Sequence, residues 1–175
     1  MGSKATISFG IVIAHHSVPL AIALENLWEA QEKAKEHTSP NGNKKDAVQV
    51  RILYGNGNIL NSTAKFDVFY QWQQLINDST KIESALFEQA AQVWSQHPAP
   101  IPEAIAPWTQ AFCTRRDFFK DDDDASLDFQ GNLANFLTQL SQSTPETKRD
   151  SEIQNWLKLA AFVKRNRNIQ IGEVS

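Results

Sequence analysis

Cysteine is almost absent from this sequence of 175 residues, since Cys113 is the only one. One cysteine excludes an internal disulfide framework and a cysteine-rich zinc module. It is typical of a reducing compartment, so we expect a cytoplasmic protein with a buried, structural thiol. Long hydrophobic runs are also missing, and none reaches the roughly 18 residues that span a bilayer. We therefore expect no membrane partner.

An excess of positive charge is missing as well. The 17 Lys and Arg residues are outnumbered by 20 Asp and Glu residues, which gives a formal net charge of −3. A chain that coats nucleic acid without sequence preference should be basic, so any such contact must come from a local patch. Basic residues gather twice, at Lys44, Lys45 and Arg51, and at Lys158, Lys164, Arg165 and Arg167. The second group is either a contact for RNA phosphates or a partner, or a solvated helix end.

Metal-ligand spacings are absent too. The four histidines form no pair at helical spacing, and adjacent His15 and His16 point to opposite faces of an extended chain. The run from Asp121 to Asp124 favours a solvated loop over a cation site, because adjacent side chains diverge. The segment from Gly55 to Asn58 lacks the Gly-Lys-Ser/Thr ending of a phosphate loop and is interpreted as a turn. We therefore predict no metal site.

The first 60 residues carry the clearest pattern. Residues 5–14 are an apolar, β-branched run, typical of a strand buried on both faces, and Gly10 inside it indicates a close approach to the backbone. Residues 20–37 predict a helix whose core face is listed here: Leu20, Leu24, Leu27, Trp28 and Ala34. Residues 47–54 alternate and predict a strand with one wetter face, on which Gln49 and Arg51 lie.

These elements form a strand–helix–strand unit that is too small to bury its first strand. Two parallel strands and one helix leave one face or edge uncovered, so we expect further strands from elsewhere in the chain or from another polypeptide. The remainder is predicted to be helical, with apolar residues at helical spacing in residues 66–76, 82–94, 133–140 and 153–164. The expected class is α+β: a partial ferredoxin-like or palm βαβ unit over residues 1–62, then an all-α domain over residues 63–175.

The end of the first strand is the most informative place for function. Ligands of open α/β sheets bind at the carboxyl ends of the strands, against the following loop and helix. Here that loop holds His15, His16 and Ser17. Imidazoles, a hydroxyl and free helix N–H groups suit phosphate or nucleobase contacts, and the sequence therefore points to the edge of a nucleotide site.

The same residues carry a family likeness. The run from Lys4 to Leu20, the Ala34-Lys35 end of the helix, and Asp46-Ala47-Val48-Gln49-Val50 resemble, in order and spacing, the large signature subunit of type III CRISPR effector complexes. In that family this strand follows the Gly-Gly-Asp-Asp hairpin of the second palm domain. The helical remainder resembles the C-terminal domain of that subunit more loosely.

The resemblance implies a function. The parent subunit converts ATP to cyclic oligoadenylate, with Mg or Mn held by the Gly-Gly-Asp-Asp hairpin. It places six residues beside the nucleotide: Ser8, Gly10, His15, His16, Ser17 and Lys35. It also implies partners: the remainder of the large subunit, other subunits of the complex, and through them CRISPR RNA and target RNA, which Lys158, Lys164, Arg165 and Arg167 would face.

Three departures from the family limit what this chain can do. Neither Gly-Gly-Asp-Asp nor an HD nuclease motif occurs in the sequence, and Ser17 stands where the family usually has lysine. The metal-binding carboxylates are missing, so we expect no catalysis by this chain alone and leave open whether it belongs to an enzyme. It is interpreted as a fragment or split subunit that completes the ATP-binding palm. The alternatives are a non-catalytic assembly module of that complex and an unrelated nucleotide-binding α+β protein.

Overall fold

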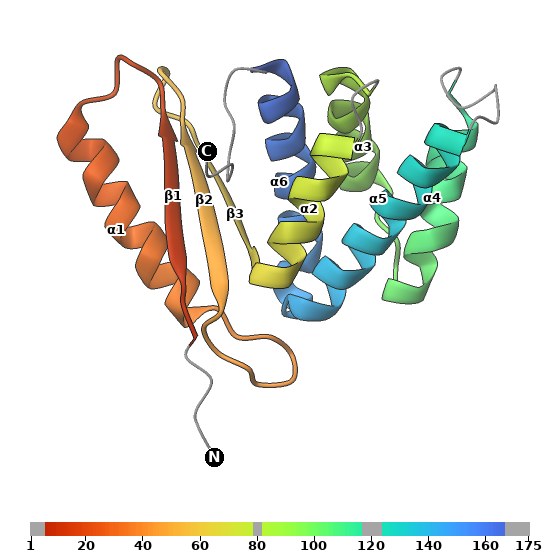
Figure 1. The fold of residues 1–175 in the computed structure, drawn as a ribbon, viewed down its shortest axis with the longest axis horizontal. Helices are drawn as coiled ribbons and strands as arrows, with labels where there is room; N and C mark the ends of the chain where they lie inside the picture. Colours follow the sequence, from red (N-terminus) through yellow and green to blue (C-terminus); the bar gives the residue numbers. More distant parts are fainter. Residues whose placement is uncertain (1–5, 79–81, 117–123, 167–175) are drawn as a thin grey trace.

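The computed structural model describes residues 6–78, 82–116 and 124–166. They form an α+β fold in three layers: one helix, a three-stranded sheet, and a group of helices (Figure 1). The first layer is α1 (Leu20–Glu36) and the sheet holds β1 (Phe9–Ala14), β2 (Ala47–Leu53) and β3 (Ile59–Lys65). The third layer comprises α2 (Phe66–Asp78), α3 (Ser84–Gln96), the 3-10 turn η1 (Pro102–Ala104), α4 (Ile105–Thr114), α5 (Asp124–Ser143) and α6 (Glu146–Arg165).

The sheet has the order β1-β2-β3, with β1 parallel and β3 antiparallel to β2. The parallel pair joined by α1 is the predicted βαβ unit. β3 was not predicted, and it passes through position 62, where the sequence placed the boundary between the two parts. Strand β2 is buried along its whole length, whereas β1 lies at the edge and is only half-buried.

Helix α1 turns a different face to the sheet than its sequence suggests. Its buried residues are Asn26, Ala30 and Ala34. Leu20 and Trp28, which we expected in the core, are 73% and 64% exposed. The reason is Gly10: a Cβ there would lie 2.7 Å from the Gln31 nitrogen and 2.8 Å from the Leu27 oxygen, so the helix backbone rests directly on the strand and only small residues fit between.

The predicted wetter face of β2 is covered by α1. Arg51 lies in this interface with its side chain 7% exposed. Its guanidinium donates to Gln49 at 2.8 Å, Asn26 at 3.0 Å and Glu29 at 2.7 Å. These partners satisfy the charge of the buried Arg51 side chain and tie α1 to β2.

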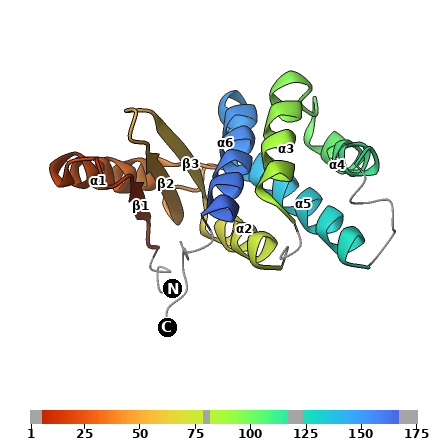
Figure 2. The ribbon, with the colours of Figure 1, turned by 90° about the horizontal axis from the view of Figure 1, so that it is seen from above.

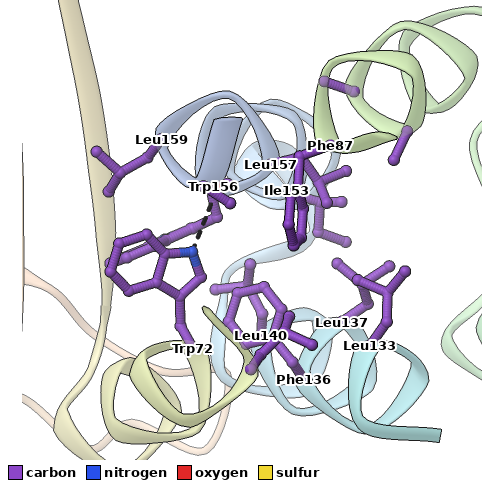
Figure 3. Packing of buried hydrophobic residues seen from close by; sticks show 14 of the residues in the cluster. Trp72, Phe87, Leu133, Phe136, Leu137, Leu140, Ile153, Trp156, Leu157 and Leu159 are labelled. Atoms are coloured by element: carbon purple, nitrogen blue, oxygen red, sulfur yellow. Dashed lines mark hydrogen bonds between the residues drawn. The ribbon is translucent and has the colours of Figure 1, made fainter. Parts of the chain in front are cut away.

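The other face of the sheet packs on the helical layer, whose core holds Trp72 and Trp156 (Figure 3). The indole rings meet edge to face with centroids 5.1 Å apart, and Trp72 Nε1 donates to the Trp156 carbonyl at 3.3 Å. This core continues without interruption from β2 into the helices.

Helix α6 lies along the outer side of β3 (Figure 2). Its side chains bond the backbone that β3 turns away from β2. Asn155 donates to the Asn61 carbonyl at 2.8 Å, Trp156 donates to the Thr63 carbonyl at 3.1 Å, and Glu152 accepts from the Thr63 N–H at 2.9 Å. Three outward-facing backbone groups in the middle of β3 are therefore bonded by α6.

Candidate functional site

The loops that follow β1 and β2 meet at one end of the sheet. The His15 N–H donates to the Leu53 carbonyl at 2.9 Å, and His15 Nδ1 lies 2.7 Å from Ser17 Oγ. The rings of His15 and His16 are 4.1 Å apart. A Cβ on Gly55 would lie 2.9 Å from His15 Nδ1 and 3.2 Å from Ser17 Oγ, so a larger residue there would displace these two exposed side chains.

A small cavity of about 220 Å³ lies between these two loops. It is mostly apolar, and its lining comprises Ser17, Val18, Pro19, Ile22, Leu53, Tyr54, Gly55, Gly57, Asn58 and Ile59. The N-terminus of α1 begins at its rim, and Pro19 supplies no side-chain cap to the first helical N–H groups. The cavity is smaller than the roughly 300–1,000 Å³ typical of ligand sites, so it accommodates part of a ligand. An apolar slot beside a hydroxyl and uncapped N–H groups suits a planar base or a small apolar group.

The six candidate nucleotide residues do not come together. His15, His16 and Ser17 are exposed neighbours on one loop. Lys35 lies at the opposite end of α1, about 25 Å away along a helix of 17 residues, and pairs with Glu32 at 2.8 Å.

Ser8 lies just before β1, at the same end as Lys35. Its hydroxyl is buried and has no hydrogen-bond partner in the part of the chain that the structure describes. Gly10 is covered by α1 and has the structural role given above. One mononucleotide cannot reach from the loop of His15, His16 and Ser17 to Ser8 and Lys35. The residues predicted from the sequence therefore lie at two opposite ends of the sheet.

The basic end of α6 approaches the loop end of the sheet, which the sequence did not reveal. Tyr54 packs edge to face on Phe162 with centroids 6.0 Å apart. Burial raises the pKa of Tyr54, and the charge of Arg165 opposes that rise. Arg165 also pairs with Glu88 of α3.

The other predicted basic residues of this group lie on or beyond α6. Lys158 is exposed and Lys164 half-buried, while Arg167 lies outside the described residues. Two of the four, Lys164 and Arg165, therefore lie in the last turn of α6, close to the Tyr54 loop.

A larger cavity of about 530 Å³ lies at the other end of the sheet. Most of its lining residues have polar side chains: Thr6, Ser39, Asn41, Asn43, Lys44, Asp46, Lys65, Asp67, Val68, Gln139, Gln142 and Ser143. Lys65 is 8% exposed, donates to the carbonyls of Asn43 and Lys45, and has its pKa lowered by burial. Because its ammonium holds the loop before β2, where Lys45 and Asp46 have positive φ, the structure gives Lys65 a role in the fold.

Other candidate chemistry is sparse in the described ranges. Cys113 is buried, and burial raises the pKa of its thiol to about 12, which suits a structural residue. In residues 6–78, 82–116 and 124–166, no three His, Cys, Asp or Glu side chains gather as metal ligands. Of the predicted acidic loop only Asp124 is described, as the first residue of α5. None of the described helices is long and apolar enough to cross a membrane.

No family model matches the chain, and no curated protein matches it.

Proposed function

We propose that this chain is a fragment or split subunit of the large subunit of a type III CRISPR effector complex, in which it completes the palm domain that converts ATP to cyclic oligoadenylate. The observation that supports this most is the incomplete sheet: a βαβ unit whose first strand has no neighbour on its outer side among the described residues. The resemblance implies that such a unit belongs to a larger sheet, whose further strands would pair with the open edge of β1. The remainder of the large subunit would supply the neighbouring strands and the Gly-Gly-Asp-Asp hairpin with Mg or Mn.

The two ends of β1 then have different roles. A hairpin that precedes β1 would lie at the end where Ser8 and Lys35 are found, so these two are the candidates to border the ATP phosphates. His15, His16 and Ser17 lie at the far end with the basic turn of α6. There they would contact the base of a second nucleotide, or RNA and neighbouring subunits in a cytoplasmic complex.

Reconstitution with a polypeptide that carries Gly-Gly-Asp-Asp tests this proposal. We expect Lys35→Ala to reduce cyclic oligoadenylate output from ATP on the order of tenfold, and His15→Ala to reduce it as well. Lys33→Ala is the matched control, since Lys33 lies on the same helix in a similar exposed ion pair, with Glu36 at 2.9 Å. Output that matches the wild type in both test variants, with complex assembly intact, would favour the non-catalytic assembly module.

A further inference from the structure

The outer edge of β1 presents unpaired backbone groups. Groups alternate along a strand, and the His15 N–H points to β2, where it bonds Leu53. The N–H groups of Ile11 and Ile13 therefore also point to β2. Those of Gly10, Val12 and Ala14, with their carbonyls, point away from the sheet. In the described chain no strand covers this edge, which is an available template for another strand.

An apolar stripe on α1 overhangs this same edge. It consists of Leu20, Leu24 and Trp28, which are 73%, 39% and 64% exposed and follow each other at one helical turn. Asn26 and Glu29, which bond Arg51, mark the side of α1 above β2. The stripe lies on the opposite side of the helix, beyond the Leu27–Gln31 backbone that touches Gly10. None of its members is charged.

The edge and the stripe share one centre. The helix runs antiparallel to β1, and Gly10 contacts it between Leu27 and Gln31. Two residues along β1 cover about 6.6 Å, which corresponds to about four residues back along α1. Leu24, the middle of the stripe, therefore lies above Val12, the middle of the three outward residues.

We propose that this surface binds a second copy of the chain, with the two β1 strands paired antiparallel about a two-fold axis through Val12. Val12 would pair with Val12 of the second copy, and Gly10 with Ala14, which satisfies all six outward N–H and C=O groups of each strand. The same axis brings Leu24 against Leu24 and Leu20 against Trp28, on two α1 helices that lie side by side.

A second copy is the favoured partner because one two-fold axis pairs both the outer edge of β1 and the apolar stripe on α1 with themselves. An isologous contact requires a surface that complements itself, and here the strand edge and the helix stripe are both centred on the same residue. The charge-free stripe avoids repulsion between copies that each carry a net charge of −3. This inference does not rest on the proposed function. Since palm completion would use the same edge, the dimer is the form of the chain apart from the rest of the large subunit.

Sedimentation of the purified chain at about 1–100 µM tests the proposal. We expect a species of twice the 19.7 kDa chain mass. Trp28→Asp should weaken association at least about thirtyfold, because it replaces a large aromatic contact by a charge on each side of the two-fold axis. Leu127→Asp, at a position 55% exposed on α5, should leave it unchanged. Since both side chains are exposed, both variants should fold.

Hydrogen exchange gives a second readout within one strand. In the dimer the amides of Gly10, Val12 and Ala14 should exchange as slowly as we expect for those of Ile11 and Ile13, which face β2. They should become fast in Trp28→Asp. A wild-type chain that stays monomeric at 100 µM would overturn the proposal. So would a dimer that Trp28→Asp leaves intact, or one in which these three amides exchange fast. None of these outcomes bears on the reconstituted cyclase.

Discussion

Two half-buried titratable groups should give this protein a nearly flat stability profile in mild acid. Burial raises the pKa of Glu152 from 4.5 to about 7, against the hydrogen bond from Thr63 that favours its charged form. Burial also lowers the pKa of His37 from 6.5 to about 4, with a further contribution from the charge of Lys65. The two shifts cover almost the same pH range with opposite sign.

The signs follow from proton binding in the two states. Between pH 4.5 and 7 the folded chain holds a proton on Glu152 that the unfolded chain has lost, so stability falls by about 3 kcal/mol as pH rises. Between pH 4 and 6.5 the unfolded chain holds a proton on His37 that the folded chain lacks, so stability rises with pH. His37 is partly exposed, and solvent screening reduces its contribution to on the order of 2 kcal/mol.

Single variants should separate these contributions. Glu152→Gln keeps an acceptor for the Thr63 N–H but cannot titrate, so its free energy of unfolding should rise by about 2 kcal/mol from pH 4 to 6.5. His37→Gln should show the reverse, a fall of about 3 kcal/mol from pH 4.5 to 7. Urea unfolding followed by tryptophan fluorescence at several pH values measures each profile. If the profiles of Glu152→Gln and the wild type run parallel, the assigned burial of Glu152 is wrong.

Three further predictions concern the packing of α1 and the thiol. Gly10→Val should destabilise the fold by about 1–3 kcal/mol in denaturant unfolding, because the valine side chain would meet the α1 backbone. Gly42→Val is the control: a side chain there has no neighbour within 4 Å, so only the positive φ of Gly42 should cause strain. Arg51→Met should keep the helical core but loosen α1, seen as faster amide exchange in α1 with little change in α6, since Arg51 bonds Asn26 and Glu29. Cys113 should resist a thiol reagent in the folded protein and react fully in urea, because it is buried with a raised pKa; rapid labelling without denaturant would contradict this placement.

The elements with regularly spaced apolar residues were predictable from the sequence. The βαβ unit and the helices at α2, α3, α5 and α6 were all expected from the sequence. Strand β3 was not, because its Asn61, Ser62 and Thr63 are polar. The strand is held in part by side chains of α6, about 90 residues later, which bond its backbone. A pattern read within a short window has no access to such a partner.

The face of α1 shows a second limit of sequence patterns. The large residues Leu20, Leu24 and Trp28 dominate its apolar pattern, yet small residues face the sheet because Gly10 brings the backbones together. Hydrophobic spacing identifies an apolar side without saying whether the same chain covers it.

In the candidate site, too, the local pattern was predictable and the long-range contacts were not. The loop of His15, His16 and Ser17 was predicted from its place after a strand. The approach of Tyr54 and Arg165 to that end depends on the packing of α6 against the sheet, which only the structure supplies.

The side chains of α6 that bond β3 limit strand addition to one edge of the sheet. Most exposed sheet edges come in pairs, and a molecule with two of them adds neighbours without end, as fibrils do. Here Glu152, Asn155 and Trp156 block the middle of one of the two edges, that of β3. Strand addition at the other edge, that of β1, stops when two copies have paired. The chain can therefore associate through a strand without forming fibres.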